Sequence, residues 1–178
     1  KAVVYSISDV PNNALTAVSD AYNEAVNITI SGVISYAKAK AIDDATNTNN
    51  GGVNSYSIND TATLIAAGVG TKVAAINGAT TVTANDAATF AEAATMSGIA
   101  KAISYSISDA QGNIPGSTTA AINEAINITI TPGTVNFAQA KIIDDGSNSG
   151  TNTYSISDTA ANLAAGTVTS VTALNGAQ

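Results

Sequence analysis

The chain has 178 residues, of which 45% are hydrophobic and only 11% are charged, and its net charge is −7. This hydrophobic content excludes the composition typical of disordered chains, and the length suits an ordinary domain with a sizeable core. The basic residues are six scattered lysines that form no patch, which argues against a nucleic-acid partner. The apolar runs are far shorter than the roughly 20 residues of a membrane span, so membrane insertion is not expected.

Seven short runs alternate apolar and polar residues, which predicts β-strands that each have one buried face. Their centres lie 23 to 28 residues apart. The runs are VVYSIS (3–8), VNITIS (26–31), NSYSIN (54–59), TTVTA (80–84), ISYSIS (103–108), INITIT (126–131) and NTYSIS (152–157). The residues expected to face the core are Val3, Tyr5, Ile7, Val26, Ile28, Ile30, Tyr56, Ile58, Val82, Ile103, Tyr105, Ile107, Ile126, Ile128, Ile130, Tyr154 and Ile156.

Helix-like stretches follow most of these runs. In residues 12–25, Leu15, Val18 and Tyr22 have the spacing of one helical face. Residues 85–98 show a start signal at Asn85 or Asp86 and a stop signal at Gly98. The chain therefore alternates strands with short helices.

An aspartate ends each YSISD or YSIND segment, and we interpret these aspartates as structural caps. Asp60 and Asp158 directly precede TATLIAAG and TAANLAAG, where a carboxylate can accept the free N–H groups of a first helical turn. Gly68 and Gly166 fall where such helices would stop. The four predicted caps are Asp9, Asp60, Asp109 and Asp158.

The segments recur at offsets of 98 to 101 residues, as in NEAVNITI (23–30) and NEAINITI (123–130). We therefore divide the chain into a first large repeat of four strand–helix units, 1–100, and an incomplete second repeat of three units, 101–178. Strands that alternate with helices predict a parallel sheet with crossover connections. Because a unit of about 25 residues cannot bury its own apolar face, we predict an α/β solenoid of about seven units. The alternative is two compact α/β repeat domains.

Two pairs of acidic residues are candidate calcium ligands. Asp43 and Asp44 precede a polar loop, and Asp144 and Asp145 precede a similar loop in the second repeat. The spacing of oxygen-bearing side chains from Asp145 is similar to the start of a calcium loop. The alternative, which we favour, is solvated acids in a turn.

The polar strand face predicts a row of hydroxyl groups that could bind ice, a glycan or another copy of the chain. The preferred interpretation is a solvated sheet face built from β-compatible residues. The residues of this hydroxyl row are Ser6, Thr29, Ser57, Thr81, Ser106, Thr129 and Ser155. With no His or Cys, and with its notable residues repeated, the chain is not expected to be an enzyme, nor to need a cofactor other than calcium.

The segments YSISDTAANLAAG (154–166) and GTVNFAQAKIIDD (133–145) resemble the Ala/Thr-rich repeats of large secreted and cell-surface bacterial proteins of the adhesin, S-layer or filament type. The resemblance implies an extracellular or cell-surface location and a role as a spacer or as a self-assembling fibre or array subunit. Its partners would be other copies or flanking repeats. The alternative function is a ligand-binding adhesin module that uses the hydroxyl row or the Asp-rich loops to hold a glycan, ice or a calcium-dependent ligand.

Overall fold

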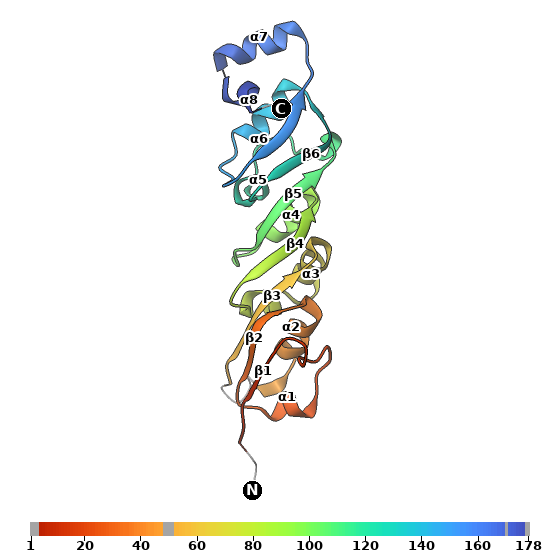
Figure 1. The fold of residues 1–178 in the computed structure, drawn as a ribbon, viewed down its shortest axis with the longest axis vertical. Helices are drawn as coiled ribbons and strands as arrows, with labels where there is room; N and C mark the ends of the chain where they lie inside the picture. The colour runs from red at the N-terminus through yellow and green to blue at the C-terminus, as the bar shows by residue number, and fades with distance from the viewer. Residues whose placement is uncertain (1–3, 48–51, 170, 177–178) are drawn as a thin grey trace. The chain divides into compact units, whose positions relative to one another are not determined.

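The computed structural model describes residues 4–47, 52–169 and 171–176. It is an α/β structure in which seven strands with parallel pairing alternate with helices in chain order (Figure 1), which confirms the predicted fold class. The strands are β1 (Ile7–Asp9), β2 (Ile28–Ile34), β3 (Asn54–Asp60), β4 (Val82–Ala88), β5 (Ser104–Asp109), β6 (Ile128–Val135) and β7 (Asn152–Ile156). The helices are α1 (Asp20–Glu24), α2 (Tyr36–Asp43), α3 (Ala62–Gly78), α4 (Phe90–Ser97), α5 (Ala120–Glu124), α6 (Phe137–Asp144), α7 (Ala160–Thr169) and α8 (Val171–Asn175), with a 3₁₀ turn at Gln111–Asn113.

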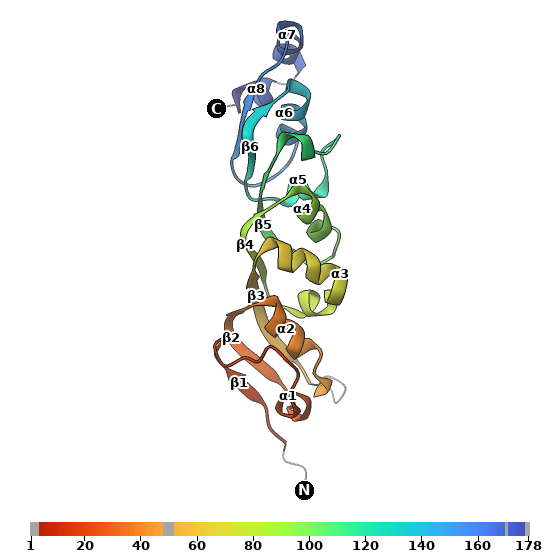
Figure 2. The same ribbon diagram turned by 90° about the vertical axis from the view of Figure 1, so that its right-hand side faces the viewer.

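The chain forms two compact units. Unit 1 comprises Lys1–Asn85 and Ile99–Ile103, and unit 2 comprises Asp86–Gly98 and Ser104–Gln178. In unit 1, β1 pairs with β2, β2 with β3, and β3 with the start of β4; in unit 2, β5 pairs with β6 and β6 with β7. Within each unit the helices lie over one face of its strands (Figure 2). Each unit therefore has two layers, with its core between them.

The core is built from the predicted inward faces of the strands. Ile28, Ile58 and Ile128 are fully buried, and Tyr56, Tyr105 and Tyr154 are at most 3% exposed. Each of these three tyrosines, and Tyr5 just before β1, donates its hydroxyl to a helix carbonyl, and burial raises the pKa of Tyr105 and of Tyr154 to about 12. These bonds join Tyr5 to Ala21 (3.0 Å), Tyr56 to Ala75 (2.9 Å), Tyr105 to Ala121 (3.0 Å) and Tyr154 to Ala173 (3.3 Å).

One inward residue was predicted wrongly, and another lies outside the described residues. Ile126 is 40% exposed because it precedes β6, at a point where the chain is still leaving α5. Val3 lies outside the described residues. An apolar residue just before a strand can therefore continue the alternating pattern in the sequence and still be exposed in the structure.

The helix predicted across residues 12–25 is mostly wrong. Only Asp20–Glu24 is helical, because the Ser19 side chain accepts the N–H of Tyr22 and starts the helix there. Tyr22 is buried, but Leu15 and Val18 are 43% and 42% exposed in the irregular segment before α1. The helical spacing of these residues therefore does not correspond to a helical face.

Three further helix signals lie elsewhere than predicted. The start at Asn85 or Asp86 is wrong because both residues belong to β4; Thr89 is the N-cap of α4, in a reciprocal capping box with Glu92. The stop at Gly68 is wrong because α3 continues to Gly78, with a kink at Lys72. Likewise α7 continues past position 166 to Thr169. The predicted stop at Gly98 is confirmed, since Gly98 is the C-cap of α4.

Candidate functional site

Three aspartates at strand ends each connect their own strand to the helix that precedes it in the chain. In every case Oδ2 of the aspartate accepts the first backbone N–H of an eight-residue helix. Such N–H groups have no partner within their helix and carry the positive end of its dipole, so a carboxylate is a favourable acceptor. We call these contacts the aspartate links. They join Tyr36 to Asp60 (2.9 Å), Phe90 to Asp109 (2.9 Å) and Phe137 to Asp158 (3.0 Å).

The second carboxylate oxygen, Oδ1, closes a turn directly after the strand. It accepts the N–H of the following residue at 2.7–2.9 Å in all three links. In two of them it also accepts the side-chain amide of an asparagine four residues later, from Asn113 to Asp109 and from Asn162 to Asp158, both at 2.7 Å. The carboxylate thus ties the strand end, the following turn and the preceding helix together.

These contacts change the role assigned to Asp60 and Asp158. The N-cap of α3 is Thr61, whose side chain accepts the N–H of Leu64 at 3.3 Å, and Thr159 accepts the N–H of Asn162 in the same way. The aspartates lie one residue earlier and bond to the helix of the previous strand–helix unit. The sequence signal that was missed is Ser/Thr/Asn, then Tyr/Phe, then Ala-x-Ala, which begins α2, α4 and α6.

The hydrogen bonds also set the acidity of two of these aspartates. Burial would by itself raise the pKa of the Asp109 carboxyl, but its three hydrogen bonds outweigh burial and hold the pKa below its ordinary value. At Asp158 the backbone N–H of Phe137 contributes most, followed by Asn162, and the pKa is again lowered. Both groups are therefore held in the charged form at neutral pH.

Asp9, the fourth predicted cap, forms only half of such a link. Its Oδ1 accepts the N–H of Val10 at 2.8 Å and the side-chain amide of Asn13 at 2.7 Å, as in the other turns. Among the described residues, its Oδ2 has no partner. Asp9 ends β1, the first strand in the order of the sheet.

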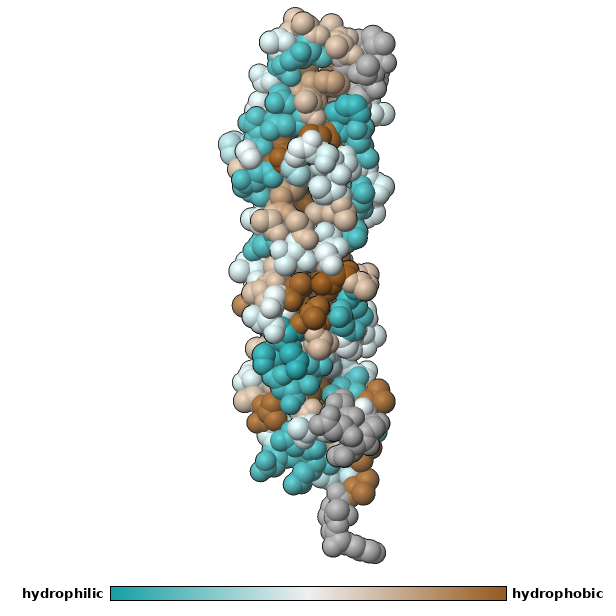
Figure 3. Space-filling model, turned by 180° about the vertical axis from the view of Figure 1, so that it is seen from behind, coloured by the Kyte–Doolittle hydropathy of each residue, from teal (hydrophilic) through white to brown (hydrophobic). Residues whose placement is uncertain are grey.

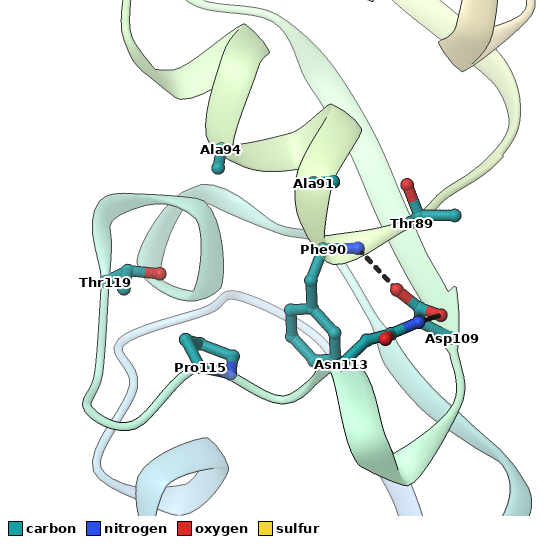
Figure 4. A pocket seen from close by; sticks show the side chains of 8 residues that line it. All are labelled: Thr89, Phe90, Ala91, Ala94, Asp109, Asn113, Pro115 and Thr119. Atoms are coloured by element: carbon teal, nitrogen blue, oxygen red, sulfur yellow. Dashed lines mark hydrogen bonds between the residues drawn. The ribbon is translucent and has the colours of Figure 1, made fainter.

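A hollow of about 470 Å³ lies beside the link between Phe90 and Asp109 (Figure 4). The figure shows Phe90 and Pro115 on its sides, with Ala91 and Ala94 on α4 above and Thr119 across from them. A second hollow, of about 320 Å³, is lined by Phe137, Ala138, Asp158 and Asn162. Both aspartates already accept hydrogen bonds through both oxygens, so these hollows offer mainly small apolar walls.

The candidate calcium ligands of unit 1 face lysines. Lys72 Nζ lies 3.2 Å from an oxygen of Asp43 and 3.0 Å from one of Asp44, and Lys40 also pairs with Asp44. The hydrogen bonds from Lys40 and then Lys72 lower the pKa of Asp44, and the bond to Asp44 raises that of Lys72. A cation would have to compete with these ammonium groups for the same oxygens.

The equivalent pair in unit 2 is arranged differently. Lys141 donates to Asp145 at 2.8 Å, and Asp144 accepts the hydroxyl of Thr172 at 2.5 Å. In the described part of the chain, no three acidic, His or Cys side chains converge as a metal site. Calcium binding by these residues stays a prediction.

The predicted hydroxyl row is wrong in its register. Thr29 aligns with Ser8 and Ser55, and Ser57 aligns with Val33. Ser6 instead accepts the side-chain amide of Asn27 at 3.4 Å. Irregularities in β2 and β6 shift the pairing, and in β2 Gly32 adopts a φ of +112° that favours glycine. The shorter rows that do form are Ser8, Thr29 and Ser55 in unit 1, and Ser108, Thr129 and Thr153 in unit 2.

Comparison with known proteins found no family model, no curated protein and no solved structure that matches this chain. The resemblance to bacterial surface repeats therefore remains a prediction. Of the helices in the described ranges, none is both long and apolar enough to cross a membrane.

Proposed function

We propose that the chain is a structural repeat module of a bacterial extracellular or cell-surface protein, serving as a spacer or as a subunit of a self-assembling fibre or array. The observation that carries the proposal is the set of aspartate links. The aspartate that recurs most regularly in the sequence bonds the ends of β3, β5 and β7 to the helix that precedes each of these strands. A module for extension or assembly needs such bonds between repeats.

The energetics favour the same interpretation. Hydrogen bonds to charged groups are stronger than those between neutral groups, so a link repeated along the chain adds to the cohesion between neighbouring strand–helix units. In repeat proteins the contacts between neighbouring units supply much of the stability. The regular spacing of the links would distribute that stability along the module.

Sedimentation velocity over a wide range of protein concentration tests the two forms of the proposal. Concentration-dependent growth into large species supports the assembling subunit. A monomer at every concentration supports the spacer and excludes self-assembly.

The second candidate is an adhesin module, and the hollow beside Phe90 favours it because an aromatic ring and small apolar walls suit the apolar face of a sugar ring. A glycan-array screen separates the two candidates. Selective binding that is lost in Ala94→Leu, which would fill the hollow, contradicts a purely structural role. An array without selective binding supports the structural role.

A further inference from the structure

We propose that the surface formed by Val4, Asp9, Val10, Leu15 and Val18 is a docking site for a strand–helix unit of the β4–α4 kind from a neighbouring repeat. In this arrangement Asp9 accepts the first N–H of the incoming helix through Oδ2. The inference rests on the proposed structural function and names the partner that one end of the module would bind. We call the five residues the docking surface.

The chemistry of Asp9 is the first argument. Its Oδ1 makes the same two turn contacts as the Oδ1 atoms of Asp109 and Asp158. In those two residues Oδ2 accepts the first N–H of an eight-residue helix, at 2.9 and 3.0 Å. Because the turn at Asp9 already has the same form, its carboxylate is oriented for a helix that the described residues of unit 1 do not supply.

The exposed apolar residues that precede and follow Asp9 in the sequence are the second argument. Val4, Val10, Leu15 and Val18 are 78%, 49%, 43% and 42% exposed, and apolar residues are visible at the surface toward the lower end of the space-filling view (Figure 3). An offset of 100 aligns them with polar or smaller residues of the second repeat, namely Ser104, Ala110, Pro115 and Thr118. Four exposed aliphatic side chains within fifteen residues, at positions where the second repeat has polar or smaller ones, favour a segment that a partner covers.

Unit 2 shows what such a surface contacts. The segment from Asp109 to Thr119 lies against α4, and Pro115 and Thr119 face Phe90, Ala91 and Ala94 across the hollow (Figure 4). At the docking surface Leu15 takes the place of Pro115 and is larger. A helix with the same Phe-Ala-x-Ala start that bonds to Asp9 would therefore contact Leu15. In unit 2 the smaller Pro115 leaves a hollow at the equivalent place.

The edge of β1 is the third argument. The N–H of Ile7 bonds to Asn27 of the neighbouring segment at 2.8 Å. Successive N–H groups of a strand point in opposite directions, so those of Ser6 and Ser8 face the other edge. Tyr5 and Ile7 are half-buried, whereas the equivalent Tyr56 and Ile58 are 3% and 0% exposed. A strand paired with β1 would cover this edge.

The test adds the proposed partner to the intact chain. Residues 80–100, which contain β4 and α4, are placed directly before Lys1, so that Lys1 follows Ala100 as Lys101 does in the natural sequence. We expect the melting temperature of the extended chain to rise by roughly 5 °C. We also expect slower hydrogen exchange at the amides of Ser6 and Ser8.

Asp9→Asn provides the matched variant, since asparagine keeps Oδ1 as an acceptor but replaces Oδ2 with a donor. It should leave the melting temperature of the parent chain almost unchanged and remove a large part of the gain in the extended chain. Asp109→Asn, which breaks a link that already exists, should destabilise both chains. An Asp9→Asn effect of equal size in both chains would overturn the proposal.

Two other results would also overturn it. The added residues could leave the exchange of Ser6 and Ser8 unaltered, which would show that they do not dock on β1. The parent chain alone could show concentration-dependent protection of these amides, which would show that a second copy occupies the edge. Either result leaves the proposed function standing, because sedimentation and glycan binding test that function separately.

Discussion

Helices α2 in unit 1 and α6 in unit 2 begin with the same aspartate link, but the space around the link is filled differently. In unit 1 the Tyr36 hydroxyl lies 3.0 Å from that of Thr71, and the Tyr36 ring packs against Gly68. In unit 2 the equivalent residue is Phe137, which has no hydroxyl and borders a hollow of about 320 Å³. The aspartate link is thus present in both units although the residues around it differ, which indicates that the link is the constant structural feature of the repeat.

The acidic pairs at the ends of these two helices differ as well. In unit 1, Lys72 of α3 joins Asp43 and Asp44. The sequence of the second repeat has Ser170 at the aligned position, which lies outside the described residues, and there Asp144 accepts the hydroxyl of Thr172 instead. In unit 1, ion pairs therefore join α2 to α3, and single substitutions can remove these ion pairs.

The largest effect is expected from Gly68→Ala. A Cβ at this position would lie 2.5 Å from Cε2 of Tyr36, whose ring is buried and cannot move aside without losing its hydroxyl contacts. Overpacking of this kind costs about 1–3 kcal/mol. Thermal and urea unfolding followed by circular dichroism would measure the loss.

Gly70→Ala is the control for this substitution. Gly70 lies in the same helix with nothing within 4 Å of its added Cβ, so alanine should be neutral or stabilise the helix by up to about 1 kcal/mol. Equal destabilisation by both alanines would show that backbone conformation, and not contact with Tyr36, requires glycine in α3.

The next effect is that of Tyr36→Phe, which gives unit 1 the residue that unit 2 has. The ring remains, but the hydroxyl contact with Thr71 is lost, and we expect the free energy of unfolding to fall by about 1 kcal/mol. A double-mutant cycle with Thr71→Ala isolates the contact. If the two single changes are simply additive, the hydroxyl pair does not stabilise the protein.

The sequence predicted the strands well because their alternation is strict and their buried residues are large. It predicted the helix ends less well. Thr89 and Glu92 form a capping box three residues beyond the start signal at Asp86, and the spacing of Leu15 and Val18 resembles a helical face without being one. Which helix an aspartate bonds to depends on the parallel pairing of strands, and no short segment contains that information.

The candidate site shows the same limit. Asp60, Asp109 and Asp158 could be chosen as structural residues because they recur, but their N–H partners lie 19 to 24 positions earlier in the sequence. The row of hydroxyl groups failed for a related reason: the irregularities at Gly32 and in β6 shift the strand pairing, and local alternation does not reveal them.

A smaller effect, visible in acid, is expected from Asn162→Leu, which gives unit 2 the leucine that unit 1 has at Leu64. Loss of the Asn162 amide should raise the pKa of Asp158 toward its ordinary value. A lowered folded-state pKa stabilises the protein above about pH 4 and loses that effect as the pH falls through the folded value. The midpoint of acid unfolding should therefore rise by a fraction of a pH unit, while Ala161→Leu, a leucine at an exposed neighbouring position, should leave it unchanged.

The smallest effect is expected from Lys72→Ser, which gives unit 1 the residue aligned in the second repeat. Lys72 and its two partners are partly exposed, so their attraction is screened by solvent and salt. We expect a slight fall in melting temperature at low ionic strength that disappears in molar salt, where the Debye length is about 3 Å. Lys101→Ser is the matched control, because Lys101 donates to the carbonyls of Ala79 and Thr80 and its loss should depend less on salt. Equal salt dependence of the two variants would show that Lys72 acts by packing its side chain, and that charge is not what distinguishes unit 1 from unit 2.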